Sequence, residues 1–348
     1  MILETLVLEA DEQSLSLAAA LLREGKLVAF PTETVYGLGA DATSVPAVLS
    51  IFRAKGRPAD NPLIVHIYDR AQLDGLCTVP DEALPLMDAF WPGPLTILFE
   101  KLPAVPDEVT AGLPTVAVRM PSHPVAAAML RACGLPIAAP SANSSGRPSP
   151  TLASHVFEDM KGKIPLVLDG GPCNVGLEST VLDLCHGKPT ILRPGGITKE
   201  MLESVLGQEV ALAGSILRPL KPDEKALSPG MRYRHYAPNA TVTLVDGKED
   251  AVLQKLKELF AAETALGKKT CVLCFSEHVG ALEGCSPHDI GSMEHADDVA
   301  RKLFSVLRQL DEEGMESVFS EVIPPEGVGL AVMNRLGRAA AFRILHAE

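Results

Sequence analysis

The chain has 348 residues, of which 47% are hydrophobic and 22% are charged, and its formal net charge is −13. This apolar content excludes a disordered chain, and the length predicts two domains with separate cores. The negative charge and an aromatic content of only 4% argue against a surface that holds nucleic acid by basic side chains and base stacking.

The first part of the chain alternates helical and strand-like segments, which predicts an α/β domain over residues 1–206. A helix is expected at 11–24, where acidic residues begin it and Gly25 ends it, and another at 44–54, capped by Ser44. A third helix closes the domain at 198–206. Short apolar runs predict strands at 27–30, 63–68, 95–99, 115–120, 137–139, 164–168, 179–184 and 190–192.

The remainder of the chain changes character twice. Residues 207–240 are rich in proline, glycine and basic side chains and predict an ordered linker. Strands then alternate with helices over 241–348, a pattern that is typical of βαβ units and a parallel sheet. Strands are expected at 241–245, 270–275 and 317–323, and helices at 250–264, 296–313 and 333–346.

Composition and motifs also disfavour several locations and binding modes. No run of about 18 apolar residues predicts a membrane span, and the N-terminal segment lacks the basic start and cleavage site of a secretory signal. Seven scattered cysteines are best explained as reduced thiols in the cytoplasm. The Walker-type phosphate loop and the GxGxxG loop are absent from the sequence, so a nucleotide would need a different cradle.

Polar clusters follow several of the predicted elements. The segment PTETVYGLG at 31–39 places three hydroxyls and a carboxylate directly after a strand, where α/β sheets commonly bind ligands, although an ordinary loop has the same composition. Lys55 and Arg57 follow a helix and predict a local anion site, unless they only complement the helix C-terminus. His66 lies in the strand after the turn at Asn61, and such a histidine is more often a core residue than a catalyst.

Later strand ends carry further polar side chains. Arg119 lies in the apolar strand VAVRM, and a buried charge there needs an anionic ligand or a carboxylate of the fold. Ser141 and Asn143 stand two apart in an extended segment, which puts both side chains on one side, although most segments of this composition are surface turns. With Arg147, Arg193 and the two cations above, these residues predict a pocket for several negative groups.

These segments, in this order, resemble the YrdC family of threonylcarbamoyl-AMP synthases. The resemblance rests on PTETVYGLG, the Lys55 and Arg57 pair, the Ser141 and Asn143 pair, and the downstream EST and LRPG segments, and it covers about residues 10–206. The segments SPGMRYRHYAP and GVGLAVMNRLGRAA are similar to the second domain of the family's long form. The resemblance implies a mixed, twisted open sheet followed by a smaller Rossmann-like parallel βαβ domain.

The resemblance also implies an activity. Family members condense L-threonine, bicarbonate and ATP to threonylcarbamoyl-AMP and pyrophosphate, for N6-threonylcarbamoyladenosine in tRNAs that read codons starting with A. No protein nucleophile is needed, Mg²⁺ accompanies ATP, and no organic cofactor is implied. The expected partners are a downstream threonylcarbamoyl-transferase complex acting on tRNA and a weak RNA contact, with no membrane, in the cytoplasm.

Residue roles follow from the same resemblance. The residues implied for L-threonine binding are Thr34, His66, Arg119, Ala139 and Ser179. Those implied for ATP binding are Arg57, Asn61, Thr115, Ser141, Ser149, Arg193 and Tyr236, the last as part of a lid from the linker. Those implied for chemistry around bicarbonate and phosphate are Lys55, Arg57, Ser141 and Asn143. No residue is implied as a metal ligand.

Three alternative functions and sites remain to be weighed. An RNA-binding or ribosome-associated module without turnover is disfavoured by the acidic charge and the few aromatic residues. A carbamoyl transferase of the hydrogenase-maturation kind would need extra regions for which the chain has no room. Cys271, Cys274, Cys285 and His288 have zinc-like spacing, but residues three apart in a strand face opposite ways, so core thiols are the better interpretation.

Overall fold

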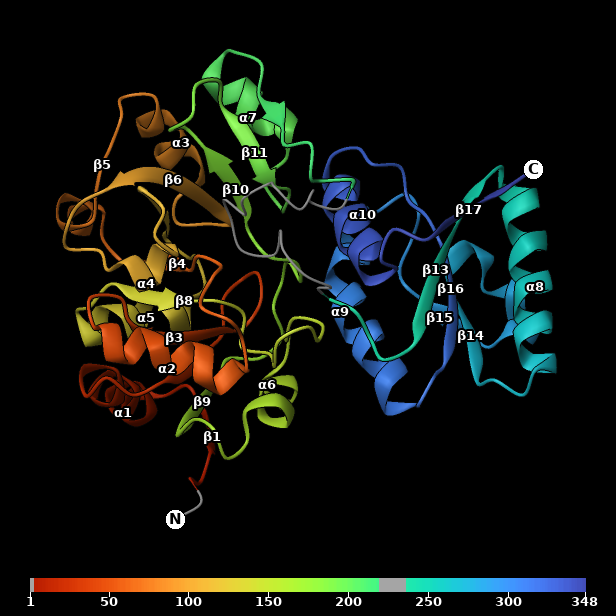
Figure 1. The fold of residues 1–348 in the computed structure, drawn as a ribbon, viewed down its shortest axis with the longest axis horizontal. Helices are drawn as coiled ribbons and strands as arrows, with labels where there is room; N and C mark the ends of the chain where they lie inside the picture. Colours follow the sequence, from red (N-terminus) through yellow and green to blue (C-terminus); the bar gives the residue numbers. More distant parts are fainter. Residues whose placement is uncertain (1–2, 219–235) are drawn as a thin grey trace. The chain divides into compact units, whose positions relative to one another are not determined.

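The computed structural model describes residues 3–218 and 236–348 of the chain, so residues 219–235 of the predicted linker lie outside the described residues. The described residues form two compact units, which are treated separately below (Figure 1). The first unit holds residues 3–145 and 149–216, and the second holds residues 236–348 with the short segments 146–148 and 217–218. In these ranges no helix is long and apolar enough to cross a membrane.

One mixed sheet of twelve strands organises the described part of the first unit, in the order β1-β9-β2-β3-β8-β4-β7-β6-β10-β11-β12, with β5 beside β6. The strands are β1 (Leu6–Glu9), β2 (Val28–Phe30), β3 (Gly37–Asp41), β4 (Ile64–His66), β5 (Cys77–Thr78), β6 (Leu95–Lys101), β7 (Thr115–Arg119), β8 (Ile137–Ala139), β9 (Leu166–Asp169), β10 (Thr180–Asp183), β11 (Thr190–Arg193) and β12 (Ala211–Leu212). The helices are α1 (Glu12–Arg23), α2 (Val45–Lys55), η1 (Arg70–Gly75), α3 (Ala83–Phe90), α4 (Asp107–Thr110), α5 (Pro124–Cys133), α6 (Ala153–Met160) and α7 (Lys199–Leu206).

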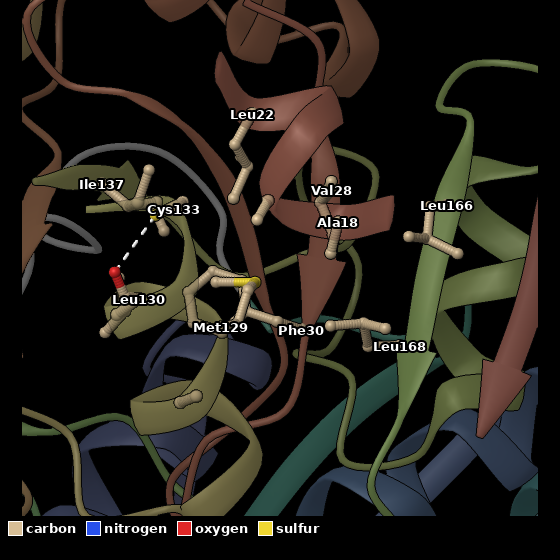
Figure 2. Close-up of a cluster of buried hydrophobic side chains, with 13 residues drawn as sticks. Ala18, Leu22, Val28, Phe30, Met129, Leu130, Cys133, Ile137, Leu166 and Leu168 are labelled. Atoms are coloured by element: carbon tan, nitrogen blue, oxygen red, sulfur yellow. Dashed lines mark hydrogen bonds between the residues drawn. The ribbon is translucent and has the colours of Figure 1, made fainter. Parts of the chain in front are cut away.

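Helices α1 and α5 pack together and against the sheet to form an aliphatic core (Figure 2). Helix α1 follows the N-cap Asp11, whose carboxylate accepts a hydrogen bond from the backbone N–H of Ser14 at 2.7 Å. It ends before Gly25, which has a φ of +73°. Leu22 of α1 and Phe30 of β2 are fully buried in this core, which closes the side of the sheet that α1 and α5 cover.

The register of four central strands places the first candidate residues beside one another. Strands β4 and β7 are parallel, with His66 opposite Arg119, and β6 runs antiparallel to β7 with Thr96 opposite Arg119. Strand β8 runs antiparallel to β4, with Ala139 opposite Ile64. Residues opposite each other in register project to the same face of a sheet, so His66, Arg119 and Thr96 are lateral neighbours.

The second unit contains a parallel sheet of five strands in its described residues, in the order β15-β14-β16-β13-β17. Its elements are β13 (Thr241–Gly247), α8 (Glu249–Ala265), β14 (Thr270–Cys274), η2 (Ser276–His278), η3 (Gly280–Cys285), β15 (Pro287–Asp289), α9 (Ala296–Glu312), β16 (Ser317–Glu321), α10 (Val328–Ala339) and β17 (Ile344–Ala347). Helix α8 covers one face of this sheet, and α9 and α10 cover the other (Figure 1). The mixed first sheet and the parallel second sheet confirm the predicted fold class.

The end of the chain differs from the prediction. The helix expected at 333–346 was wrong, because α10 covers Val328–Ala339 and the chain then turns into β17, which pairs in parallel with β13. The turn holds Ala341 and Phe342 at positive φ values of 49° and 58°. Such positions usually carry glycine or asparagine, so no residue type in this sequence marks the end of the helix.

A strand also occupies part of the segment that was expected to be a loop. Residues Gly37–Asp41 form β3, which pairs with β2 and β8. A side-chain Cβ at Gly39 would lie 2.9 Å from Ile137 Cγ2 and 3.0 Å from the Phe30 ring. The glycine therefore permits close packing within the sheet. Cys271 and Cys274 are both buried in β14, as expected for core thiols.

Candidate functional site

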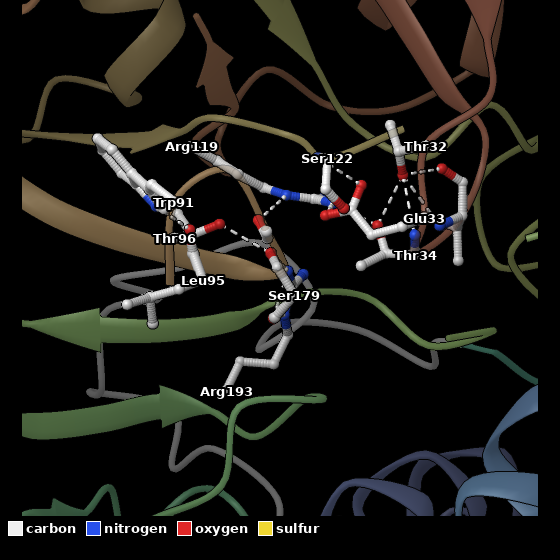
Figure 3. A network of polar contacts seen from close by, with 12 residues as sticks. Thr32, Glu33, Thr34, Trp91, Leu95, Thr96, Arg119, Ser122, Ser179 and Arg193 are labelled. Atoms are coloured by element: carbon white, nitrogen blue, oxygen red, sulfur yellow. Dashed lines mark hydrogen bonds and ion pairs between the residues drawn. The ribbon is translucent and has the colours of Figure 1, made fainter. Parts of the chain in front are cut away.

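The guanidinium of Arg119 lies at the centre of a buried polar network at the end of β7 (Figure 3). Its Nε donates to the backbone oxygen of Gly93 at 3.2 Å, and its Nη1 donates to Thr34 Oγ1 at 2.8 Å. Its Nη2 forms an ion pair with Glu33 Oε1 at 2.6 Å. Arg119 is only 3% exposed, so these partners offset the cost of burying its charge.

The segment between β2 and β3 presents Glu33 and Thr34 to this network. Thr32 shapes the turn, because its hydroxyl donates to the backbone oxygen of Val35 at 2.6 Å and accepts from the N–H groups of Thr34 and Val35, each at 3.2 Å. Tyr36 points elsewhere and donates to the backbone oxygen of Gly171 at 2.7 Å. Of the three hydroxyls that the sequence singled out here, Thr34 contacts Arg119, while Thr32 and Tyr36 hold the backbone.

The charge states of this network follow from burial and from the arginine. Burial alone would raise the pKa of Glu33, but the Arg119 charge and hydrogen bond outweigh it and hold that pKa below its ordinary value. Burial, and then the Arg119 charge, lower the pKa of His66 to about 3. His66 is therefore an uncharged imidazole at neutral pH. Its Nδ1 lies 3.1 Å from the Ile64 carbonyl, which can only accept, so Nδ1 carries the proton.

A second buried group continues the network across β6, β10 and β11. The hydroxyl oxygens of Thr96 and Ser179 are 2.7 Å apart. Arg193 of β11 donates to the backbone oxygen of Ser179 from Nε at 3.1 Å and from Nη2 at 3.0 Å, and Nη2 also donates to Ser179 Oγ at 3.1 Å. Next along the chain, Glu178 accepts a short hydrogen bond from the Ser149 hydroxyl. Ser179 thus joins residues expected for threonine to residues expected for ATP.

Lys55 holds the loop that follows β8. It is the last residue of α2 and is 5% exposed, and Gly56 ends the helix in a left-handed conformation. Its Nζ donates to the backbone oxygen of Ser141, to the backbone oxygen of Asn143 at 2.6 Å and to Asn143 Oδ1 at 3.4 Å. The Ser141 hydroxyl donates to the same Asn143 oxygen. The predicted catalytic residues Lys55, Ser141 and Asn143 therefore form one cluster.

The remaining predicted ATP residues lie at the other ends of β4 and β7. Thr115 begins β7, four residues or about 13 Å from Arg119 along the strand. Asn61 precedes β4, is buried, and its backbone oxygen accepts from Arg57 Nη2 at 3.0 Å. Strand β8 runs antiparallel to β4, so its carboxyl end and the Ser141 loop point toward this same end. The first unit thus holds two polar groups, one around Arg119 and one around Lys55.

Two predicted residues lie in the second unit. Tyr236 is 2% exposed. The centroid of its ring lies 5.3 Å from the centroid of the Phe304 ring and 5.7 Å from Cζ of Arg335. Its role in ATP binding stays a prediction. Arg147 belongs to the short segment assigned to the second unit, and its Nη2 lies 4.0 Å from Asp311. Sequence reasoning gave no role to Glu33 or to Thr96, although a polar residue inside an apolar strand could have marked Thr96.

Acidic, histidine and cysteine side chains do not gather around these groups in the described residues. Within residues 3–218 and 236–348, no group of three or more histidine, cysteine or acidic side chains is placed to hold a metal ion. The carboxylates of Glu33 and Glu178 are each engaged by neighbouring side chains.

Known proteins resemble the whole chain. Residues 20–195 match the family model Sua5_yciO_yrdC, described as Telomere recombination, and residues 197–341 match the model described as Threonylcarbamoyl-AMP synthase, C-terminal domain. The chain is 47% identical over 336 residues to the threonylcarbamoyl-AMP synthase of Pyrococcus abyssi and 46% identical over 343 residues to that of Bacillus subtilis. These matches cover 96% and 97% of this chain and 96% of each relative.

A solved structure resembles it along its full length as well. The crystal structure of P. abyssi Sua5 complexed with L-threonine has a TM-score of 0.92 and 45% identity, and the match covers 100% of both chains.

Proposed function

The chain belongs to the Sua5/YrdC family of threonylcarbamoyl-AMP synthases, and we propose that it joins L-threonine, bicarbonate and ATP on the two polar groups of its first unit. It is an enzyme of the nucleotidyltransferase type. The observation that carries the assignment of substrates to these groups is the buried Arg119 guanidinium, which is fixed at the end of β7 beside hydroxyls and an uncharged histidine.

Arg119 binds the threonine carboxylate in this proposal. An arginine has five N–H donors. In the part of the chain that the structure describes, Nε and Nη1 each donate one hydrogen bond and Nη2 forms the ion pair with Glu33, which leaves donor capacity on both terminal nitrogens. Two parallel donors suit a carboxylate, and Glu33 keeps the guanidinium in place while the substrate binds. A solved relative that holds L-threonine supports this choice of substrate.

Thr34, His66, Ala139 and Ser179 complete the threonine site. Thr34 Oγ1 and Ser179 Oγ are polar atoms already bound to the arginines, so each is oriented before the substrate arrives. His66 contributes an uncharged ring, which does not repel the threonine ammonium. Ala139 pairs with Ile64 and adds a small apolar side chain.

ATP binds along Arg57, Asn61, Thr115, Ser141, Ser149 and Arg193, and the chemistry takes place at the Lys55 cluster. The threonine amine attacks bicarbonate-derived carbon dioxide and loses a proton to give a carbamate. A carbamate oxygen then attacks the α-phosphorus of ATP, and the bond to the leaving pyrophosphate breaks. Lys55, through the oxygens it holds in Ser141 and Asn143, fixes the loop around the reacting groups, so that catalysis rests on positioning and charge.

Further parts of the proposal concern what accompanies the reaction. Mg²⁺ would come with ATP and be bound by phosphate oxygens and water, where it would neutralise phosphate charge, and no step is assigned to it. We place the reaction in the cytoplasm, because all seven cysteines are unpaired thiols. The product passes to a transferase complex that acts on tRNA. Direct RNA contact and the lid role of Tyr236 remain predictions.

An omission series tests this function. The purified chain is incubated with ATP, L-threonine, bicarbonate and Mg²⁺, and pyrophosphate release is followed with each component left out in turn. We expect release to need threonine and bicarbonate together. Release at the same rate without threonine would contradict the proposal, and salt-dependent RNA binding without any turnover would favour the RNA-binding alternative.

A further inference from the structure

The second unit contains a cavity of about 440 Å³ that the reaction above does not use. It lies at the carboxyl ends of β13 and β16, which are neighbouring strands of the parallel sheet, and its lining includes residues of α8, α10 and β17. Small-molecule sites of parallel α/β sheets lie at this end of the strands, and their volumes are about 300–1,000 Å³. Position and size are therefore those of a ligand site.

The wall of the cavity is largely apolar. Its hydrophobic lining comes from different elements and includes Met293, Ile323, Met333 and Phe342. Methionine side chains adapt to the shape of a bound molecule, and the Phe342 ring, with the Arg338 guanidinium 6.0 Å from its centroid, adds a flat apolar surface. This wall suits the apolar body of a ligand.

One end of the cavity is polar and built from a buried pair. His278 Nδ1 lies 2.6 Å from Glu321 Oε1, and both side chains are less than 10% exposed. The other oxygen of Glu321 accepts the backbone N–H of Phe275 at 2.8 Å. His278 Nε2 lies 3.4 Å from Glu249, whose side chain is 66% exposed at the rim. The carboxylate of Glu321 is thus held rigidly at the lining of the cavity.

The charge of the lining is negative. Asp246, Glu249 and Glu321 are the carboxylates, and His278 is the titratable base. His346 lies 3.4 Å from Asp246 outside the lining. None of the lining residues in the described part of the chain is lysine or arginine. Phosphates and nucleotides need such cations or a glycine-rich loop, whereas an ammonium group is attracted to three carboxylates against one imidazole.

We propose that this cavity is a second ligand site, which binds a small organic cation with its ammonium group at Glu321 and Glu249 and its apolar body against Met333 and Phe342. Its lining residues lie wholly within the second unit, and none of them is assigned to the threonylcarbamoyl-AMP reaction above.

Binding of three probes of similar shape but different charge to the full-length chain tests whether the cavity prefers a cation. The probes are 2-phenylethylamine, 2-phenylethanol and 3-phenylpropionate, titrated by calorimetry and by chemical-shift changes of methyl-labelled methionines. We expect the amine to bind with a dissociation constant of about 1 mM or below, the alcohol to bind about tenfold more weakly, and the acid not to bind. Equal binding of amine and alcohol, or no binding of the amine at about 10 mM, overturns the proposal.

Substitutions of the lining residues test whether the amine binds in this cavity. Glu321→Gln keeps the shape and still accepts the Phe275 N–H, and we expect it to weaken amine binding about tenfold. Glu249→Gln changes an exposed side chain, cannot upset the fold through burial, and should weaken binding about threefold. The matched control is Glu258→Gln, on the same helix α8 but outside the lining, and it should bind like the unaltered chain. An equal loss in Glu258→Gln and Glu249→Gln would show a surface charge effect and refute the site.

Discussion

Replacing Arg119 by lysine separates the planar fork of this side chain from its charge. The lysine ammonium still neutralises Glu33, which now lies 2.6 Å from the guanidinium, so the buried carboxylate keeps a partner. One nitrogen cannot reach Gly93 O, Thr34 and Glu33 and also present two parallel donors to a ligand. If the fork binds the threonine carboxylate, the variant loses about one charge-assisted hydrogen bond, or roughly 1.5–3 kcal/mol.

This loss corresponds to a fall of about 10- to 150-fold in kcat/KM for threonine. The assay is pyrophosphate release with threonine varied at saturating ATP and bicarbonate, and then with ATP varied at saturating threonine. The KM for ATP should change less than about threefold. Arg23→Lys is the matched control, because Arg23 also donates to backbone oxygens, those of Ala132 and Cys133, between α1 and α5. An unchanged threonine KM in a folded Arg119→Lys variant would refute the carboxylate role.

The same pair makes a separate prediction about stability. Arg119→Ala leaves Glu33 buried without its partner, and we expect it to lower the free energy of unfolding by about 3–5 kcal/mol. Adding Glu33→Gln to this variant removes the unpaired charge and should recover part of the loss. Urea denaturation of the two variants measures the difference. A double variant less stable than Arg119→Ala would contradict the reasoning, because the unpaired Glu33 carboxylate would then not be the cause of the loss.

Three further predictions concern other residues of the first unit. Lys55→Met removes the Nζ that holds Ser141 and Asn143, so kcat should fall at least about 100-fold in a chain that stays folded by circular dichroism. The control Lys101→Met should be fully active. Near-normal turnover of Lys55→Met would contradict the role of Lys55. The pKa of His66 in the folded chain, about 3, lies below its unfolded value of about 6.5, so its contribution to stability is present above pH 6.5 and is lost as the pH falls toward 3. Between pH 6.5 and 4.5, the free energy of unfolding of His66→Asn, measured by urea denaturation, should fall about 2–3 kcal/mol less than that of the unaltered chain. Equal losses would argue against a buried neutral ring. A Cβ at Gly195 would lie 2.3 Å from the Thr180 backbone nitrogen and 2.6 Å from the Ser179 carbonyl carbon, so Gly195→Ala should displace Ser179 and lower kcat/KM for both substrates about tenfold or more in steady-state assays. The control Gly75→Ala has open space around it and should not change kcat/KM. Unaltered kinetics of Gly195→Ala would show that the site tolerates displacement of Ser179.

The sequence allowed the fold class to be predicted because most elements carry their own pattern. Apolar strands separated by helices over 241–323 indicate a parallel sheet, and the structure has one. The pattern failed where a turn is made by ordinary residues, as at Ala341 and Phe342 before β17. It failed also at β3, since glycine has a low strand propensity and the pairing of β3 with β2 and β8, where a Cβ at Gly39 would lie 2.9 Å from Ile137, is not visible in the local sequence.

The sequence indicated individual polar side chains of the two groups but not which of them contact one another. A charged residue within VAVRM indicates that Arg119 has an anionic partner, and the structure supplies Glu33. Glu33 follows β2 and Arg119 ends β7, and strands β3, β8 and β4 lie between β2 and β7 in the sheet, so no local sequence pattern joins the two residues. The contact of Lys55 with Ser141 depends on tertiary structure in the same way, whereas Arg193 and Ser179 meet because the consecutive strands β11 and β10 pair antiparallel.

Label transfer tests the central claim most directly. The chain is incubated with [¹⁴C]bicarbonate and ATP labelled at the α-phosphorus, and the nucleotides are separated rapidly, with and without L-threonine. The account predicts one new adenylate that carries both labels and forms only when threonine is present. Pyrophosphate release with AMP as the sole nucleotide product from the first time point, and no compound carrying both labels, would contradict it.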